Sequence, residues 1–343
     1  MTKDGRTRDG ARDRKAEHIE LALDPRAQLR PSAFDGHYLE HQALPEIDLA
    51  AVDTATRFLG RELAMPLLIS CMTGGTEQAA KINRNLALAA EESRVALGIG
   101  SQRKAIEDST QAVTFQVREL APSVPLLANL GAVQLNYGFG LAECRRAVEM
   151  IEADALVLHL NPLQEALQPE GQGDFSGLAD RIGAIVDGLD VPVIVKEIGC
   201  GLSGATARAL KSAGVSIFDS AGLGGTSWAR IEAWRACDPE LGELFADWGV
   251  STVESIRQLR EIGGLTIIGS GGVRSGVDVA KVLALGADLA GLAQPFLQTA
   301  IESVAATLTR LARTRRELEI AMFCSGAANL AELQRLPLRS HVE

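Results

Sequence analysis

A dense group of polar side chains follows one apolar segment in the middle of the chain. Residues 155–175 read ALVLHLNPLQEALQPEGQGDF, so an apolar run too short for a helix ends abruptly in His159, Asn161, Gln164 and Glu165. This pattern predicts a buried strand that delivers hydrogen-bond donors and one carboxylate to its C-terminal edge. In parallel α/β folds, the catalytic and ligand-binding residues lie at this edge.

Two glycine-rich segments nearer the C-terminus add a second kind of chemistry. SGGVRSG (270–276) and GLAQP (291–295) each end an apolar run, where backbone N–H groups and a helix N-terminus commonly hold a phosphate. They point to a phosphorylated cofactor or substrate. Lys196 ends the buried run VIVK, where an ammonium is costly unless it meets an anion or an electron-rich ring.

Each of these features also has a purely structural interpretation. A glycine-rich segment taken singly is more often a turn, His159 alone fits a core histidine, and Asn129 alone fits a strand-end cap. Arg14 and Lys15 fit solvated charges on the first turn of a helix, RKAEHIELAL. Lys196 has the weakest structural explanation, because a lysine at the end of a buried run is seldom structural.

The surrounding sequence predicts a closed parallel barrel. From Pro66 onward, eight apolar runs alternate with Ala- and Leu-rich segments of helical periodicity, which fits a TIM (β/α)8 barrel. The predicted strands are 66–72, 96–102, 125–131, 155–161, 192–199, 215–222, 265–272 and 289–296. The predicted helices between them include 79–93, 141–153, 204–214 and 275–287.

The ends of these elements and of the chain carry further expectations. Each of the four helices is expected to end near a glycine that acts as its C-cap. Residues 297–333 are expected to form two helices with Gly326 between them. Residues 1–13 have almost nothing to bury and are predicted to be a flexible tail, and residues 14–343 are predicted to form one domain.

Composition excludes several classes of protein. The net charge of -10 among 343 residues argues against nucleic-acid binding, which calls for a basic face. No apolar run is long enough to span a bilayer, and the N-terminal residues contain no signal-peptide core. The five cysteines show no paired or metal-like spacing and are expected to be separate thiols. We therefore expect a cytoplasmic protein without nucleic-acid or membrane partners.

One competing fold has a motif in its favour. Gly199, Gly201 and Gly204 spell GxGxxG after the strand 192–198, and Asp219 ends the next strand where a ribose-binding acid would lie. This match is typical of a dinucleotide-binding fold. We rank it below the barrel because it lies among similar β/α units and because Lys196 interrupts the strand that precedes it.

The chain resembles the type 2 isopentenyl diphosphate isomerases from Arg14 to Phe296. The motifs that carry the resemblance are RKAEHI (14–19), MTGG (72–75), GSQR (100–103), NLGAVQ (129–134), HLNPLQE (159–165), QPEG (168–171), VKEIGCGLS (195–203), GGTSW (224–228) and GSGGVRSG (269–276). The resemblance implies an FMN-binding TIM barrel, with Mg²⁺ and a reduced nicotinamide cofactor, NADPH, that reduces the flavin. It also implies a homotetramer or larger assembly.

The resemblance further implies a role for individual positions. It implies flavin contacts at Cys71, Met72, Thr73, Ser101, Asn129, Lys196, Thr226, Gly271, Gly272, Val273, Arg274, Ala293 and Gln294. It implies contacts with the substrate diphosphate or its surroundings at Arg14, Lys15, Ser101, Gln102, Arg103, His159, Asn161 and Gln164. Glu165 is implied to bind Mg²⁺. Arg14 and Lys15 reach the site only if the N-terminal segment closes over it, so residues 10–20 are expected to gain protection when substrate binds.

The implied reaction interconverts isopentenyl and dimethylallyl diphosphate. It adds a proton at C4 of the substrate and removes one at C2. The strand ends offer no obvious pair of Glu, Asp or Cys side chains for these two transfers, and Glu165 is assigned to Mg²⁺. We therefore hypothesise that reduced FMN exchanges the protons and that Gln164 orients the substrate or relays a proton. The alternatives are an FMN-dependent barrel oxidoreductase of the hydroxy-acid or dihydropyrimidine type, and a flavin-binding protein without catalytic activity.

Overall fold

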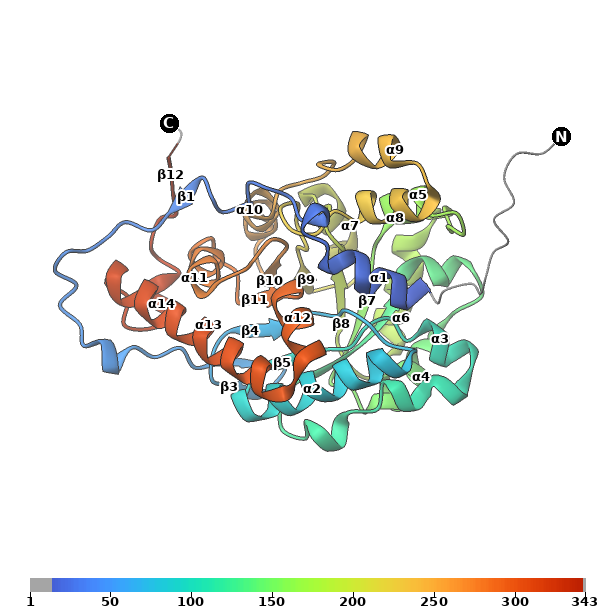
Figure 1. The fold of residues 1–343 in the computed structure, drawn as a ribbon, viewed down its shortest axis with the longest axis horizontal. Helices are drawn as coiled ribbons and strands as arrows, with labels where there is room; N and C mark the ends of the chain where they lie inside the picture. The colour runs from blue at the N-terminus through green and yellow to red at the C-terminus, as the bar shows by residue number, and fades with distance from the viewer. Residues whose placement is uncertain (1–13, 342–343) are drawn as a thin grey trace.

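The computed structural model describes residues 14–341, and its core is a closed barrel of parallel strands (Figure 1). The barrel strands are β4 (Leu67–Ile69), β5 (Ala96–Gly98), β6 (Leu126–Gly131), β7 (Ala155–His159), β8 (Val193–Lys196), β9 (Ile217–Asp219), β10 (Thr266–Ser270) and β11 (Leu289–Leu292). They follow one another around the barrel in chain order, and β11 pairs with β4 to close it. Each predicted strand therefore forms, and the dinucleotide-binding alternative is wrong.

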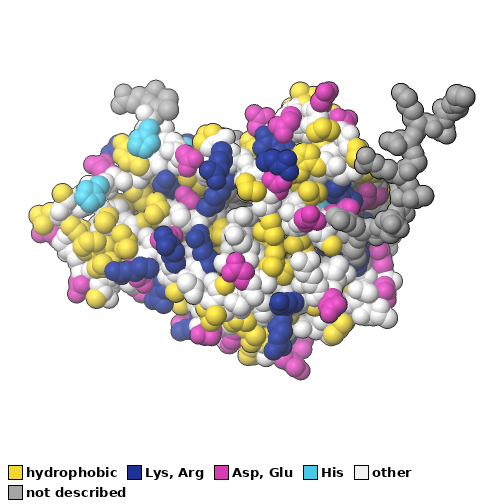
Figure 2. Space-filling view, viewed as in Figure 1, with side chains coloured by type: hydrophobic (Ala, Val, Ile, Leu, Met, Phe, Trp, Pro, Cys, Tyr) yellow, Lys and Arg dark blue, Asp and Glu magenta, His cyan; other side chains and the backbone are white. Residues whose placement is uncertain are grey.

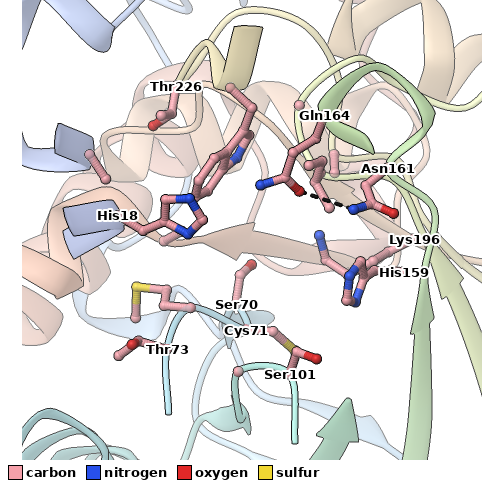
Figure 3. Close-up of a pocket in the computed structure, with 18 of the residues that line it drawn as sticks. His18, Ser70, Cys71, Thr73, Ser101, His159, Asn161, Gln164, Lys196 and Thr226 are labelled. Carbon is pink, nitrogen blue, oxygen red and sulfur yellow. Dashed lines mark hydrogen bonds between the residues drawn. The ribbon is translucent and has the colours of Figure 1, made fainter. Parts of the chain in front are cut away.

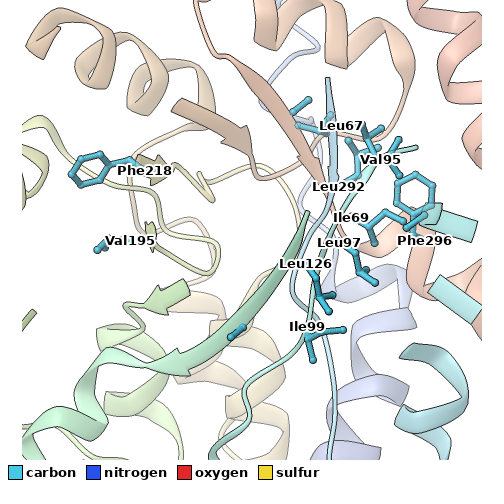
Figure 4. Packing of buried hydrophobic residues seen from close by; sticks show 14 of the residues in the cluster. Leu67, Ile69, Val95, Leu97, Ile99, Leu126, Val195, Phe218, Leu292 and Phe296 are labelled. Atoms are coloured by element: carbon cyan, nitrogen blue, oxygen red, sulfur yellow. The ribbon is translucent and has the colours of Figure 1, made fainter. Parts of the chain in front are cut away.

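Alternation along the strands separates two apolar cores. Leu67 and Ile69 pack outward against the helices (Figure 4), whereas Leu68 between them faces the barrel interior. A hairpin of β2 (Thr56–Phe58) and β3 (Arg61–Leu63) adds Phe58 and Leu63 to the interior cluster. Because these side chains pack with residues from the beginnings of the strands, the hairpin fills the end of the barrel opposite the strand C-termini.

Helices surround this barrel. They are α2 (Glu77–Ser93), α3 (Arg103–Glu107), α4 (Leu141–Ile151), α5 (Pro162–Leu167), α6 (Leu178–Gly188), α7 (Gly204–Ser212), α8 (Trp228–Ala236), α9 (Pro239–Leu244), α10 (Thr252–Ile262) and α11 (Gly276–Ala284). Short 3₁₀ helices lie at Pro25–Ala27, Leu49–Ala51, Ser109–Thr114, Arg118–Leu120 and Ala132–Asn136. Two short strands, β1 (His37–Tyr38) and β12 (Arg339–Ser340), pair near the two ends of the described chain.

Two of the four helices end near a glycine, as predicted, and two do not. The C-cap residues of α7 and α11 are Ala213 and Leu285, and Gly214 and Gly286 follow them with φ of +91° and +97°. Helices α2 and α4 end instead on Arg94 and Glu152, which adopt the left-handed conformation with φ of +53° and +50°. Their backbone N–H groups still bond the last carbonyls of each helix, so the cap is made without a glycine.

The C-terminal segment contains one more helix than predicted. Gly326 ends α13 (Val304–Ser325) before α14 (Leu330–Leu333), as expected. However, a further break at Ser303 separates α12 (Gln294–Glu302) from α13. Ser303 is extended, and its hydroxyl accepts a hydrogen bond from the Ala306 N–H, so it acts as the N-cap of a new helix.

The N-terminal helix lies beside the C-terminal ends of the barrel strands. Helix α1 (Arg14–Leu23) forms where the sequence predicts it and contacts α8 and α12 (Figure 1). The predicted tail at residues 1–13 lies outside the described residues.

On the face shown in Figure 2, Lys and Arg side chains are interspersed with acidic and hydrophobic ones. Among residues 14–341, no helix is both long and apolar enough to cross a membrane.

Candidate active site

A cavity of about 500 Å³ opens at the C-terminal ends of the barrel strands (Figure 3). Helix α1 contributes Lys15, His18 and Ile19 to its wall. Most of the predicted site residues line it: Lys15, Cys71, Met72, Thr73, Ser101, Arg103, Asn129, His159, Asn161, Gln164, Glu165, Lys196, Thr226, Gly271, Gly272, Val273, Arg274, Ala293 and Gln294. The barrel thus brings together side chains that are far apart in the sequence.

Two predicted residues are not part of this set. The side chain of Arg14 is outside the described part of the structure. Gln102 is fully buried behind the cavity, where its amide donates to the Ala147 carbonyl at 2.8 Å and accepts from the Asn129 N–H at 3.0 Å. This geometry gives Gln102 a supporting position behind Asn129 instead of a place in the cavity wall.

One end of the cavity has the properties of a phosphate site. Gly271 and Gly272 have φ of +104° and +72°, and a Cβ atom on either would lie 2.1 or 2.4 Å from a backbone oxygen of the neighbouring loop. Only glycine fits this backbone packing. Burial, together with the nearby Arg30, lowers the pKa of Arg274, against the smaller opposite effects of Asp278 and Asp35. A partly buried guanidinium beside a glycine-rich turn is compatible with a bound anion, so the residues present fit the phosphate of FMN.

The middle of the cavity presents polar atoms that lack protein partners. The hydroxyls of Ser70 and Thr73 are buried and make no hydrogen bond to the described residues, and both line the cavity. Lys196 is also buried, and its Nζ donates to the Glu197 carbonyl at 2.5 Å. Buried polar groups are normally paired, so these hydroxyls indicate a ligand with polar edges, as the flavin ring has. Burial raises the pKa of the adjacent Cys71 thiol to about 11, which keeps it protonated.

The other end of the cavity holds the polar cluster after β7. His159 Nδ1 donates to the Asn129 amide oxygen at 2.8 Å, which fixes the ring orientation. The Asn161 amide donates to Gln164 Oε1 at 3.0 Å (Figure 3). It also donates to Glu165 Oε1 at 2.8 Å. The side-chain oxygen of Asn161 is buried without a hydrogen-bond partner among the described residues. The cluster therefore keeps an acceptor available for a donor or a cation.

Glu165 has the chemistry that a Mg²⁺ site needs, although protein donors also bind it. It is 8% exposed and lines the cavity; Gln168 and the Gln172 N–H donate to its Oε2, the latter at 2.7 Å. No group of three His, Cys, Asp or Glu side chains suited to a metal lies within the described part of the chain. One carboxylate with phosphate and water oxygens is a donor set that Mg²⁺ accepts, so the residues fit a shared, substrate-dependent cation.

Cationic side chains lie near the same cluster. Lys15 Nζ is 3.4 Å from the Ser101 carbonyl, which brings α1 to the end of β5. Arg103 pairs with Glu107 at 2.8 Å and donates to the Gln172 side chain at 3.1 Å. These two cations supply positive charge to the cavity of an acidic protein.

Three cavity-side residues were not predicted individually. Glu232 on α8 is fully buried and accepts from Gln164 Nε2 at 2.6 Å, and His18 Nε2 lies 2.9 Å from the same carboxylate oxygen. Trp228 packs edge-on against His18 with ring centroids 5.3 Å apart. Burial alone would raise the pKa of Glu232, but the bonds from His18, Gln164 and Arg235 lower it, so it is ionised at neutral pH. The helical spacing of Trp228 and Glu232, four residues apart, is a signal that could have placed both on one face.

The fold and the site together define a TIM barrel of the FMN-dependent type. The family model described as FMN-dependent dehydrogenase matches residues 166–340. Among solved structures, a mandelate oxidase variant with an FMN adduct has a TM-score of 0.63 at 19% identity, covering 94% of this chain and 92% of that one. A putative lactate oxidase of Pediococcus acidilactici has a TM-score of 0.66 at 18% identity, covering 91% and 85%. At this identity the two structures support the fold alone.

Relatives of much higher sequence identity show which family of FMN-dependent barrels the chain belongs to. The isopentenyl-diphosphate delta-isomerase of Paracoccus zeaxanthinifaciens is 51% identical over 94% of this chain and 95% of its own length. That of Synechococcus sp. is 50% identical over 94% of each chain. The chain belongs to the FMN-dependent, type 2 isopentenyl-diphosphate delta-isomerase family.

Proposed function

We propose that this enzyme interconverts isopentenyl and dimethylallyl diphosphate with FMN as its prosthetic group. The observation that carries the proposal is a single cavity with two ends whose residues suit an anion: the glycine-rich turn with Arg274, and the cluster of Lys15, Arg103 and His159. One end suits the phosphate of FMN and the other a diphosphate. The names of the relatives support the same substrate pair.

In this proposal the chain's own residues bind and orient the diphosphate. Lys15 and Arg103 neutralise its charge, His159 donates to its oxygens through Nε2, and Arg14 joins them from the start of α1. Asn161 would present its side-chain oxygen to the bound cation, because its NH₂ group already donates to Gln164 and Glu165. Glu165 and the diphosphate oxygens would hold Mg²⁺ between them. The acidic protein thereby meets an anionic substrate with local cations and one metal ion.

In this proposal, proton transfer at the carbon atoms of the substrate does not fall to the described side chains of the cavity wall. The carboxylates in the described wall of the cavity are Glu107, Glu165 and Glu170, and each already bonds a protein donor. Reduced FMN would supply the acid and base chemistry beside the apolar tail of the substrate. The Gln164 amide, fixed by Asn161 and Glu232, would orient the substrate next to it or relay a proton.

Other parts of the proposal come from the resemblance to the family. NADPH would reduce the flavin, without net redox change in the isomerisation. Residues 14–343 would act as one domain, in a homotetramer or larger assembly located in the cytoplasm. Closure of the N-terminal segment on substrate would raise hydrogen-exchange protection of residues 10–20, and unchanged protection would contradict it.

The test is an anaerobic incubation with isopentenyl diphosphate, FMN, Mg²⁺ and NADPH, followed by proton NMR. A parallel sample omits the reductant. Formation of dimethylallyl diphosphate with a catalytic amount of reductant supports the proposal. A flavin-loaded protein that gives no product rejects it, and stoichiometric consumption of reductant would favour the oxidoreductase alternative instead.

A further inference from the structure

Arg235, on the side of α8 that faces α1, bonds three carboxylates from three separate elements. Its Nη1 donates to Glu232 Oε2 at 2.5 Å, its Nε to Glu17 Oε2 on α1 at 3.1 Å, and its Nη2 to Glu170 Oε1 at 3.0 Å. Glu170 belongs to the loop after α5. The Arg235 side chain is only 11% exposed. A guanidinium holds its donors in a rigid plane, so these three contacts constrain one another.

The three contacts differ in their surroundings. Glu232 is fully buried, whereas the side chains of Glu17 and Glu170 are 32% and 45% exposed. Exposed ion pairs contribute little, while a buried carboxylate deprived of its cation is strongly penalised. The buried contact should therefore be permanent, and the two outer contacts should be easily made and broken.

The buried contact leads directly to the proposed site. Glu232 uses Oε2 for Arg235 and Oε1 for Gln164, so one carboxylate connects the guanidinium with the amide. His18 of α1 lies 2.9 Å from the same Oε1. Arg235 thus reaches α1 through Glu17 and the Gln164 amide through Glu232.

We propose that Arg235 is a positioning residue that sets the orientation of the Gln164 amide through Glu232 and, with the same guanidinium, docks α1 and the Glu170 loop over the cavity. The proposal rests on the proposed function, because Gln164 matters only if the cavity carries out the isomerisation. It goes beyond that function by assigning one side chain, which does not line the cavity, to both the closing helix and the Gln164 amide.

The experiment compares four variants of the full-length, FMN-loaded protein: Arg235→Gln, Arg235→Lys, Glu17→Gln and the control Arg315→Gln. Arg315 lies on α13, where it is 49% exposed and pairs with Glu319 of the same helix at 3.0 Å, and it does not line the cavity. Turnover of isopentenyl diphosphate gives kcat and KM, and hydrogen exchange of α1 is measured without substrate. FMN content is determined for every variant.

Arg235→Gln should lower kcat on the order of tenfold or more, the scale expected for loss of a charge-assisted hydrogen bond at a buried group. Arg235→Lys should recover part of this loss, because it keeps a cation beside Glu232. Glu17→Gln should raise KM up to about fivefold, with kcat within about twofold of the wild type. Both Arg235→Gln and Glu17→Gln should speed exchange in α1, and Arg315→Gln should change none of these quantities.

Two results would overturn the proposal. If Arg235→Gln raises KM without lowering kcat, as expected for Glu17→Gln, the guanidinium holds α1 in place but does not orient the Gln164 amide. If both Arg235 variants lose FMN in proportion to kcat, the residue is structural. A wild-type protein that binds FMN but does not isomerise the substrate would refute the proposed function instead, while the exchange of α1 would still test whether Arg235 docks that helix.

Discussion

Replacing Glu232 by Gln tests whether the orientation of the Gln164 amide governs turnover. The substitution keeps the shape of a fully buried side chain but removes its charge. The carboxylate accepts from Gln164 Nε2 at 2.6 Å and from Arg235 Nη1 at 2.5 Å. A glutamine has one oxygen and one NH₂ group, so its NH₂ must face one of these two donors.

The expected magnitude follows from the lost contact. A hydrogen bond to a charged group contributes about 1.5–3 kcal/mol. If the whole of this energy stabilises the transition state, its loss lowers the rate by roughly 10- to 150-fold. The pKa of Glu232 is lowered in the folded protein, so its stabilising contribution is complete above the ordinary carboxylate pKa and is lost as pH falls through the lowered value. At neutral pH the variant should therefore show the full effect.

The assay is kcat by proton NMR with FMN content and thermal unfolding measured in parallel. Glu243→Gln is the matched control, because Glu243 is 58% exposed and pairs with Arg230 away from the cavity. We expect Glu232→Gln to retain FMN and lose turnover, and the control to resemble the wild type. A flavin-loaded Glu232→Gln with more than half of the wild-type kcat would refute the reasoning, and equal loss of flavin and turnover would assign Glu232 to stability.

Three further predictions concern the flavin side of the cavity. Lys196→Ala should weaken FMN binding by roughly 10- to 150-fold, as loss of a charge-assisted contact implies, and a fully loaded, active variant would contradict this. Gly271→Ala should lower both FMN content and the unfolding midpoint, because the added Cβ would lie 2.1 Å from a backbone oxygen. The control is Gly60→Ala, at a position that also has positive φ but open space around it. This control should lower the free energy of unfolding by only about 1–3 kcal/mol, measured by denaturant unfolding. Iodoacetamide at pH 8 should alkylate the exposed Cys237 well before Cys71, whose pKa is about 11, and peptide mapping that finds the reverse order would show that the Cys71 thiol is accessible and ionised.

The barrel could be predicted from the sequence because each strand carries the same local pattern. A short apolar run followed at once by polar or glycine residues occurs eight times, and the carboxyl ends of parallel strands must converge on one face. Convergence alone places Thr73, Asn129 and Lys196 in one cavity. The ends of α2 and α4 could not be predicted in this way, because Arg94 and Glu152 adopt a conformation that composition assigns to glycine.

The part of the site that the sequence did not reveal depends on helix packing. Glu232 lies inside an α8 segment that carries no strand-end signal, and its role follows only from the approach of α5 and α1 to that helix. Gln102 shows the reverse case: it follows a strand end, yet its side chain turns away and bonds Asn129 and Ala147. The apolar pattern of a strand predicts the residue at which the strand ends. The direction of the next side chain depends on neighbours that lie far away in the sequence.

The two ends of the cavity depend on different parts of the fold. The glycine-rich turn at Gly271 and Gly272 belongs to the barrel itself, because its backbone packs against the loop after β9. The Gln164–Glu232–Arg235 chain depends instead on α1, α5 and α8, which lie outside the strands. Changes confined to these helices would therefore alter the Gln164–Glu232–Arg235 chain while leaving the glycine-rich turn in place.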